Sequence, residues 1–123
     1  MKKIIYTNQA PEPVGPYSQA ILTDNTLYCS GQIAINPETN ELVLDSIENE
    51  AEQIMKNINA VLTEAGFTFK DVIKTTCFLD NMANFAKFNE IYAKYFTSKP
   101  ARSCVVAKLP KGVHIEVEVI ASK

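Results

Sequence analysis

The sequence predicts an α+β domain in which two helices cover one face of a mixed or mostly antiparallel β-sheet. Short segments of alternating or β-branched residues lie at both ends of the chain and between two longer segments. The longer segments carry apolar residues at the three- and four-residue spacing of amphipathic helices. The predicted order is β-β-β-α-β-α-β-β, and a two-layer domain of this kind leaves the other face of the sheet uncovered. We expect a solvated site or a subunit interface there.

The first part of the chain predicts a short strand, a loop and a hairpin. Residues 3–6 suit a strand, and Gln9–Pro16 holds three prolines and a glycine, which favour a loop. The two segments Ser18–Thr23 and Thr26–Ile33 flank the turn dipeptide Asp24-Asn25 and therefore predict a β-hairpin.

A long helix is predicted to follow a turn at Asn36–Asn40. Asp45 suits its N-cap, and Glu48 three residues later would complete a capping box. Gly66 suits the position just after its last turn. The apolar residues that recur at helical spacing are Ile47, Ala51, Ile54, Ile58, Val61 and Ala65.

The second half of the chain predicts a strand, a helix and two closing strands. Val72–Leu79 is β-branched and aromatic, which favours a strand. The helix after it is expected to bury one aromatic stripe, made of Phe85, Phe88, Tyr92, Tyr95 and Phe96. The next strand is predicted over Arg102–Leu109. In the last strand, period-two alternation puts His114, Glu116 and Glu118 on one face.

Composition limits both the size class and the function class. A chain of 123 residues with 46% hydrophobic residues is predicted to form a single domain over residues 1–123. The formal net charge of -2 leaves no surplus of Lys and Arg to neutralise phosphates. We therefore expect no nucleic-acid partner, although a local basic patch stays possible.

We expect a cytoplasmic protein without a membrane partner. The apolar stretch after the two N-terminal lysines is short, whereas a secretory h-region needs about 7–15 apolar residues and a membrane span roughly 18. Cys29, Cys77 and Cys104 are widely spaced, and His114 is the lone histidine. A disulfide framework and a zinc site of about four clustered ligands are therefore not expected.

Two residues near the start of one strand suggest a binding site. Arg102 could grip a carboxylate through two parallel hydrogen bonds, but an exposed arginine paired with a surface glutamate is the commoner arrangement. Cys104 shares the face of Arg102 if the strand is regular. Its thiol could have a pKa lowered by the guanidinium, or it could be a small buried filler.

Other candidates lie on the neighbouring segments. Glu116 or Glu118, predicted on the strand next to Arg102, could orient or deprotonate a water, or simply balance a lysine. Tyr17 follows Gly15-Pro16 and could cap a pocket or plug an edge of the sheet. Gly31 interrupts a strand pattern, which indicates a bulge or a close approach, a ligand being one thing that could approach.

Two further polar residues are candidates for the site. Asn89 lies on the aromatic side of the second helix and needs a hydrogen-bond partner there. His114 is the one residue on which a Ser-His-Asp or Cys-His unit could depend, and it is predicted instead as an exposed strand residue. The sequence contains no P-loop, GxGxxG, GxSxG or HExxH motif.

Six short motifs occur in a fixed order along almost the whole chain. They are GPYSQA (15–20), SGQI (30–33), FNEIY (88–92), KPARSC (99–104), LPKG (109–112) and IEVEVIA (115–121). In these motifs the chain resembles the reactive-intermediate deaminase (Rid/YjgF) family of the endoribonuclease L-PSP superfamily. Each motif is short, and their order and spacing carry the resemblance.

The resemblance implies a chorismate-mutase-like α+β fold and a homotrimer whose three sheets form a central β-barrel. It implies sites in the clefts between subunits, built from both sides. The implied activity is hydrolysis of 2-iminobutanoate and 2-iminopropanoate, the products of PLP-dependent threonine and serine dehydratases, to 2-keto acids and ammonia. No metal or organic cofactor is implied.

The resemblance also implies roles for individual residues. Arg102 would bind the substrate carboxylate, and Glu116 would hold or activate the attacking water. The pocket would be completed by residues that line it, shape its floor or support it from the second helix: Tyr17, Ser30, Gly31, Cys104 and Asn89.

One segment departs from the family pattern. After Arg102 this chain reads RSCVVAKLP, where the family commonly reads RSCVEVARLP, so one residue is missing. A missing residue reverses the side-chain alternation unless a bulge absorbs it. Glu118 is therefore the second candidate for the water-handling carboxylate.

Three alternatives to the deaminase remain. A keto-acid-binding regulatory trimer on the same fold would bind without turnover. A ribonuclease or translation inhibitor is disfavoured by the acidic charge balance and by the lack of a His/Glu/Arg nuclease arrangement. A holdase-type chaperone has no signal in the sequence for or against it.

Overall fold

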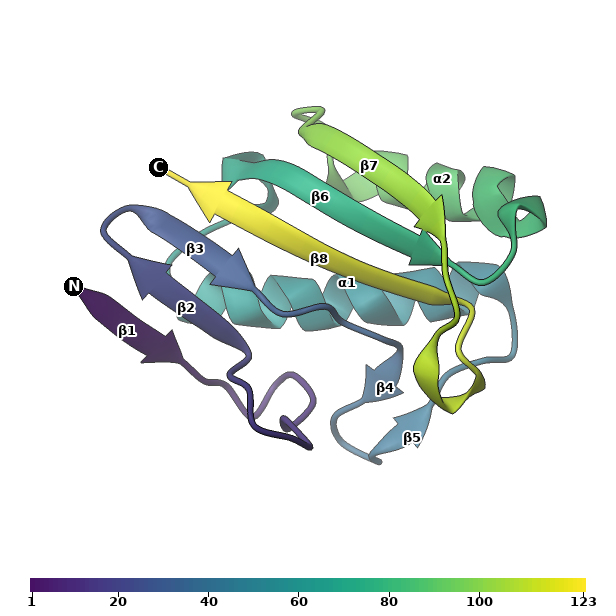
Figure 1. The fold of residues 1–123 in the computed structure, drawn as a ribbon, viewed down its shortest axis with the longest axis horizontal. Coiled ribbons are helices and arrows are strands. Elements are labelled where there is room, and N and C mark those ends of the chain that lie inside the picture. The colour runs from purple at the N-terminus through teal and green to yellow at the C-terminus, as the bar shows by residue number, and fades with distance from the viewer.

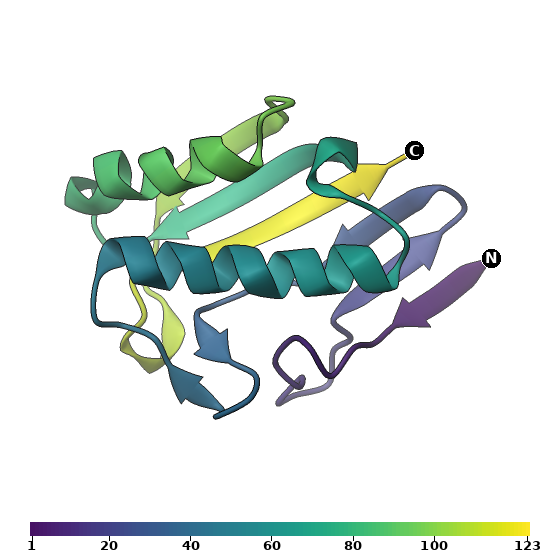
Figure 2. The same ribbon diagram turned by 180° about the vertical axis from the view of Figure 1, so that it is seen from behind.

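A six-stranded mixed sheet lies against two helices in the computed structural model, which describes residues 1–123 (Figures 1 and 2). The strand order is β1-β2-β3-β8-β6-β7, and only the β6–β7 pair is parallel. The elements of this layer are β1 (Lys2–Ile5), β2 (Ala20–Thr23), β3 (Thr26–Cys29), α1 (Ile47–Glu64), β6 (Val72–Leu79), α2 (Phe85–Tyr95), β7 (Ala101–Val106) and β8 (Ile115–Ser122). The α+β class predicted from the sequence is confirmed, and so is the predicted element order apart from one additional small hairpin between β3 and α1.

The predicted hairpin is present as β2 and β3, which pair from Ala20↔Cys29 to Thr23↔Thr26. Asp24 adopts a positive φ of 51° at the turn, a conformation that Asp tolerates better than most residues. The predicted turn at Asn36–Asn40 connects two short strands that the sequence does not predict, β4 (Ile35–Asn36) and β5 (Glu41–Leu42), which form a small hairpin.

The start of α1 differs by one residue from the prediction. Ser46, not Asp45, is the N-cap, and its side chain accepts a hydrogen bond from the Asn49 backbone N–H at 3.0 Å. Asp45 instead accepts from the Asn49 side-chain amide. The predicted end is confirmed, because Gly66 follows the C-cap residue with a positive φ of 83°.

The β6–α2–β7 unit places the aromatic stripe of α2 in the core, as predicted. Phe88, Tyr92 and Phe96 are buried, and the rings of Phe85 and Tyr95 pack against the core from its margin. β7 ends at Val106 rather than at the predicted Leu109. The register between β6 and β7 runs from Lys74↔Ala101 to Leu79↔Val106 without a shift, so the side chains of β7 alternate regularly.

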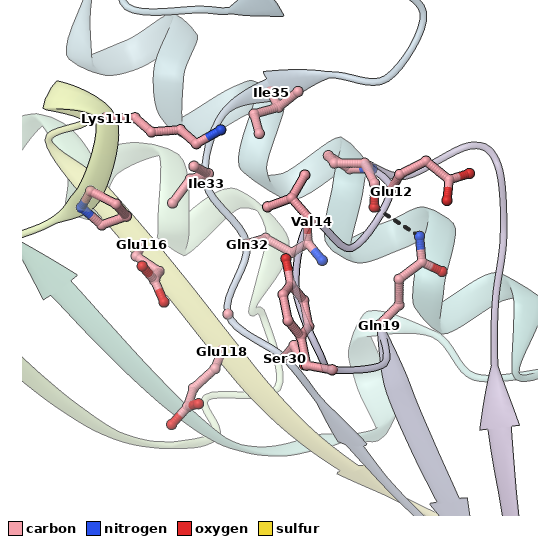
Figure 3. Close-up of a pocket in the computed structure, with 14 residues that line it drawn as sticks. Glu12, Val14, Gln19, Ser30, Gln32, Ile33, Ile35, Lys111, Glu116 and Glu118 are labelled. Carbon is pink, nitrogen blue, oxygen red and sulfur yellow. Dashed lines mark hydrogen bonds between the residues drawn. The ribbon is translucent and has the colours of Figure 1, made fainter. Parts of the chain in front are cut away.

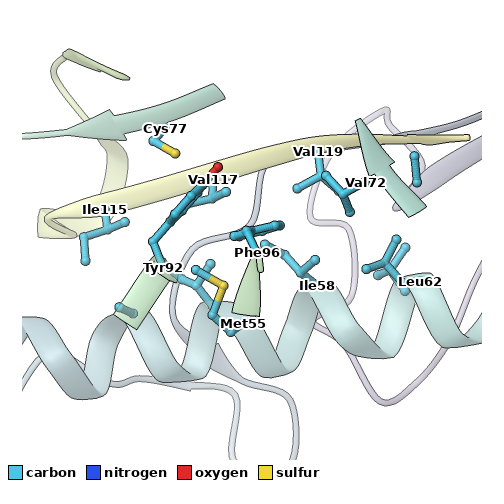
Figure 4. Close-up of a cluster of buried hydrophobic side chains, with 14 of the residues drawn as sticks. Met55, Ile58, Leu62, Val72, Cys77, Tyr92, Phe96, Ile115, Val117 and Val119 are labelled. Carbon is cyan, nitrogen blue, oxygen red and sulfur yellow. The ribbon is translucent and has the colours of Figure 1, made fainter. Parts of the chain in front are cut away.

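The two faces of β8 have opposite character. Ile115, Val117, Val119 and Ala121 are buried against the helices, and Figure 4 shows Val117 and Val119 above Met55, Ile58 and Leu62 of α1. The alternate residues, Glu116, Glu118, Ile120 and Ser122, lie on the uncovered face. The predicted alternation is therefore correct for Glu116 and Glu118.

None of the helices has both the length and the apolar character needed to cross a membrane.

Candidate functional site

A cavity of about 460 Å³ lies on the uncovered side of the molecule, where the loop before β2, the segment after β3 and the start of β8 meet (Figure 3). Four sequence-predicted residues line it together, namely Tyr17, Ser30, Gly31 and Glu116. Glu118 lines it too, and Figure 3 shows its carboxylate on the same side of β8 as that of Glu116. The cavity is thus acidic along β8 and is bordered by Lys111 on the loop before that strand.

Gly31 is the point where the side chain of Glu116 meets the backbone. A Cβ atom at position 31 would lie 2.3 Å from Glu116 Oε2 and 3.0 Å from its Cδ. The close approach predicted at Gly31 is therefore present, and within this chain the approaching group is a carboxylate. Any larger residue at position 31 would have to displace Glu116 from its place in the cavity.

Glu116 has the electrostatic character of a reactive carboxyl group. Burial, and secondarily the negative charge of Glu118, raise the pKa of Glu116, and no hydrogen bond within the chain offsets them. A carboxyl group whose pKa rises toward neutral pH is better matched to general acid–base work than an ordinary surface glutamate.

Ser30 and Gln19 shape the cavity through the backbone. Ser30 Oγ donates to the Ser18 carbonyl at 2.6 Å, and the Ser30 N–H donates to the Gln19 carbonyl at 2.9 Å. Gln19 is buried, and its amide accepts from Thr7 N–H and donates to the Thr7 and Pro11 carbonyls. Gln19 thereby holds in place the loop segment from Pro11 that forms one wall of the cavity.

Gln19 is a site residue that the sequence does not predict. Its partners Thr7 and Pro11 are 12 and 8 residues away, so no local pattern marks it as buried. Tyr17 was predicted to cap a pocket or plug a sheet edge, and the structure places it, half-exposed, on the lining of the cavity.

A second group of predicted residues lies between α2 and β7, beside another cavity of about 690 Å³. Arg102 Nη1 donates to Asn89 Oδ1 at 2.7 Å, and the guanidinium carbon lies 4.5 Å from the centre of the Tyr92 ring. Tyr92 is itself held by Thr75, with 2.8 Å between the hydroxyl oxygens. The predicted partner of Asn89 is therefore Arg102.

The guanidinium of Arg102 is oriented without being neutralised. The ion pairs within the chain are Met1–Asp24, Lys94–Glu52 and His114–Glu50, so Arg102 is not paired with a surface glutamate. An amide and an aromatic face hold it instead. Its remaining N–H groups stay available for an anion, for which the planar fork is well suited.

Cys104 lies on the same face of β7 as Arg102, as predicted, and the structure decides between the two alternatives for its thiol. Burial raises the pKa of Cys104, and the lowering influence of Arg102 is smaller. Cys104 is the register partner of buried Cys77 and packs against the core. The thiol therefore has the character of a half-buried filler, the second of the two alternatives left open by the sequence.

The two groups of residues do not meet within one chain. β7 and β8 are not neighbours, contrary to the prediction, because β6 lies between them. Arg102 is in register with Thr75, whose side chain is buried under the helices, whereas Glu116 is in register with Phe78, whose side chain lies on the uncovered face. Arg102 and Glu116 therefore project from opposite faces of the sheet.

The lone histidine is also placed differently from its prediction. His114 precedes β8, and its Nδ1 lies 2.7 Å from Oε1 of Glu50 on α1. This hydrogen bond to Glu50 is the main cause of a raised pKa of His114. No three His, Cys, Asp or Glu side chains in the chain are arranged to hold a metal ion.

Comparison with known proteins identifies the family. The model of the Endoribonuclease L-PSP family matches residues 7–123. A Yersinia pestis protein described as belonging to the conserved Rid protein family has a crystal structure that superposes with a TM-score of 0.96 at 49% identity, over 100% of both chains. The chain belongs to the Rid/YjgF family.

Two curated relatives illustrate the range of names within the Rid/YjgF family. A RutC family protein of Pyrococcus horikoshii is 52% identical over 100% of this chain and 99% of its own length. The human 2-iminobutanoate/2-iminopropanoate deaminase is 46% identical over 98% of this chain and 90% of its own length. The family resemblance inferred from GPYSQA, SGQI and KPARSC is thereby confirmed.

Proposed function

We propose that the chain hydrolyses 2-imino acids, in particular 2-iminobutanoate and 2-iminopropanoate, to 2-keto acids and ammonia. The observation that carries the proposal is the guanidinium of Arg102, which Asn89 and Tyr92 orient without neutralising. A second observation is the half-buried Glu116 with its raised pKa. The name of the human relative agrees with this activity.

We further propose that a second copy of the chain completes each site, within a homotrimer whose three sheets form a central barrel. Arg102 and Glu116 on opposite faces of one sheet cannot act on one small molecule, but the cleft between two chains can join them. The uncovered face supports such packing, because register pairing places four apolar residues in one row across β1, β2, β3 and β8: Ile4, Ile21, Tyr28 and Ile120. Ile4 and Tyr28 are 66% and 49% exposed in the single chain, as expected for a face that another subunit covers.

In the proposed mechanism Arg102 binds the substrate carboxylate through two parallel hydrogen bonds and fixes the imine carbon in the cavity. Glu116 accepts a proton from a water as the water oxygen attacks that carbon in the protonated imine, which forms a neutral carbinolamine. Glu116 then gives this proton to the amino nitrogen and accepts the proton of the new hydroxyl group as the C–N bond breaks, so that the keto acid forms. The leaving ammonia takes the proton from Glu116 and departs as ammonium. The reaction consumes one water and requires no metal or organic cofactor.

We propose that PLP-dependent threonine or serine dehydratases supply the substrate. The test couples a threonine dehydratase to the protein in the presence of semicarbazide, which traps the free imine. Wild type should suppress semicarbazone formation, Arg102→Ala should not, and Lys108→Ala should behave as wild type because Lys108 is an exposed cation outside both cavities.

Two outcomes contradict the proposal in different ways. If the wild-type protein leaves the semicarbazone rate unchanged while binding 2-ketobutyrate through Arg102, the protein is a ligand-binding regulator and not a deaminase. If Arg102→Ala retains full suppression, the imine is hydrolysed without the arginine, and its role as carboxylate clamp is wrong.

A further inference from the structure

Glu50, in the first turn of α1, is the only charged residue among the buried ones and is 0% exposed. Its Oε2 accepts from the His114 N–H at 2.8 Å and from the Ile115 N–H at 3.0 Å, and its Oε1 lies 2.7 Å from His114 Nδ1. A buried carboxylate is tolerated only when several donors compensate its lost hydration. All three contacts of Glu50 are made with Ile115, the first residue of β8, and with His114 just before it.

The carboxylate of Glu50 takes the place of a neighbouring strand beside the first residue of β8. On the side of β8 away from β6, the Val117 N–H and C=O bond to the C=O and N–H of Gln32. Two residues earlier the Ile115 N–H points to that same side, where no strand continues, and the carboxylate of Glu50 accepts it. On the other side, the Asp80 N–H donates to the His114 carbonyl at 3.0 Å. The start of β8 is therefore held from both sides.

Glu116 lies between these two anchors. Glu50 fixes Ile115 before it, and Gln32 fixes Val117 after it. Gln32 is also the residue next to Gly31, over which the Glu116 carboxylate stands. A displacement of the start of β8 would therefore change the distance between Glu116 and the floor of the cavity.

We propose that Glu50 is a positioning residue of the candidate active site, which holds the start of β8 so that the Glu116 carboxylate stands over Gly31 in the cavity. The effect on turnover rests on the proposed imine hydrolysis, whereas the effect on the geometry of Glu116 does not. Glu50 itself lies on the helix side of the sheet and does not line the cavity.

Three variants separate position from charge. Glu50→Leu fills a similar volume but leaves the two backbone N–H groups without an acceptor. Glu50→Gln removes the charge and keeps the contacts, because its oxygen can accept from both N–H groups while its amide donates to Nδ1 of a neutral His114. Glu52→Leu is the matched control on the same helix, since Glu52 joins α1 to Lys94 and Tyr95 of α2 rather than to β8.

In the coupled imine assay we expect Glu50→Leu to lower kcat at least tenfold with a change in KM below threefold, because the carboxylate of the substrate is bound elsewhere, by Arg102. Glu50→Gln should keep at least a third of the wild-type kcat, and Glu52→Leu should stay within twofold of it. If Glu50→Leu does not fold, Glu50→Asp replaces it, since it keeps the charge but shortens the side chain by one methylene. An unchanged kcat in a folded Glu50→Leu or Glu50→Asp variant overturns the proposal.

A second readout does not depend on deaminase activity. The carboxyl carbon of Glu116 is titrated by NMR in wild type, Glu50→Leu and Glu50→Gln, with Glu118, Lys111 and Glu12 left in place around the cavity. We expect the raised pKa of Glu116 to fall toward its ordinary value in Glu50→Leu and to remain in Glu50→Gln. If wild type shows no imine hydrolysis, the proposed function fails and this titration alone decides the role of Glu50. Equal titration curves in all three proteins overturn it.

Discussion

Two glutamates at the start of β8 differ in almost every respect: Glu50 of α1 contacts the strand from the helix side of the sheet, and Glu116 projects from the strand on the uncovered face. Glu50 is fully buried, and three hydrogen bonds to His114 and Ile115 compensate its lost hydration. Glu116 is half-buried, stands beside another carboxylate, and has no compensating donor within the chain. A buried carboxylate whose oxygens are fully hydrogen-bonded, such as that of Glu50, holds the backbone in place. A carboxylate without such donors, such as that of Glu116, has a raised pKa and can exchange a proton.

The largest expected effect comes from removing the uncompensated carboxylate. Glu116→Gln should lower kcat for imine hydrolysis by roughly 10²–10⁴-fold, the usual contribution of a general base, while the free energy of unfolding stays close to that of wild type. The measurement is the coupled assay together with urea denaturation. Full activity in a folded Glu116→Gln variant would contradict this role for Glu116 and would make Glu118 the candidate general base.

A smaller loss is expected when Glu116 is displaced rather than removed. Gly31→Ala places a Cβ atom 2.3 Å from Glu116 Oε2, so the carboxylate must shift. We expect kcat to fall on the order of tenfold to a hundredfold, as misplaced catalytic groups do. A crystal structure of the variant should show the carboxylate moved, and wild-type kinetics would mean that its position over Gly31 is not needed.

The next prediction concerns the neighbour of Glu116. Because the charge of Glu118 contributes to the raised pKa of Glu116, Glu118→Gln should lower that pKa. The acid limb of the pH profile of kcat/KM would then move to lower pH, with a change of only a few-fold in its plateau. An acid limb that stays in place, or moves to higher pH, would show that another group sets it.

The smallest expected effect concerns Glu50, the fully hydrogen-bonded carboxylate, and its partner His114. Glu50 raises the pKa of His114 in the folded chain, so the folded state binds the proton more tightly than the unfolded state. This stabilisation is fully present below the ordinary histidine pKa and is lost as the pH rises through the raised value. His114→Asn, which can still donate to Glu50, should remove this loss in urea denaturation between pH 5.5 and 8.5; a wild-type slope in the variant would contradict it.

The sequence predicts the fold better than the site, and particular residues explain why. Element types follow from local periodicity, which is read directly along β8 and α2. The N-cap differs by one residue because Asp45 and Ser46 are both good caps and only the backbone decides between them.

The site depends on strand order and on burial, which local patterns do not encode. Nothing in the sequence indicates that β6 separates β7 from β8, or that burial outweighs Arg102 in its effect on the pKa of Cys104. Gln19 and Glu50 find their partners 8 to 65 residues away. The close approach at Gly31, by contrast, was foreseen, because a glycine in a strand pattern usually has such a reason.

The central claim is that Arg102 of one chain and Glu116 of another act on the same substrate. Its most direct test mixes two inactive variants, Arg102→Ala and Glu116→Gln, after unfolding and refolding them together, and measures imine hydrolysis. In mixed oligomers about a quarter of the sites would pair an intact Arg102 with an intact Glu116, so activity should reappear in the mixture. If mixed oligomers form and the activity stays at the level of the separate variants, the site is not shared between chains and the account is wrong.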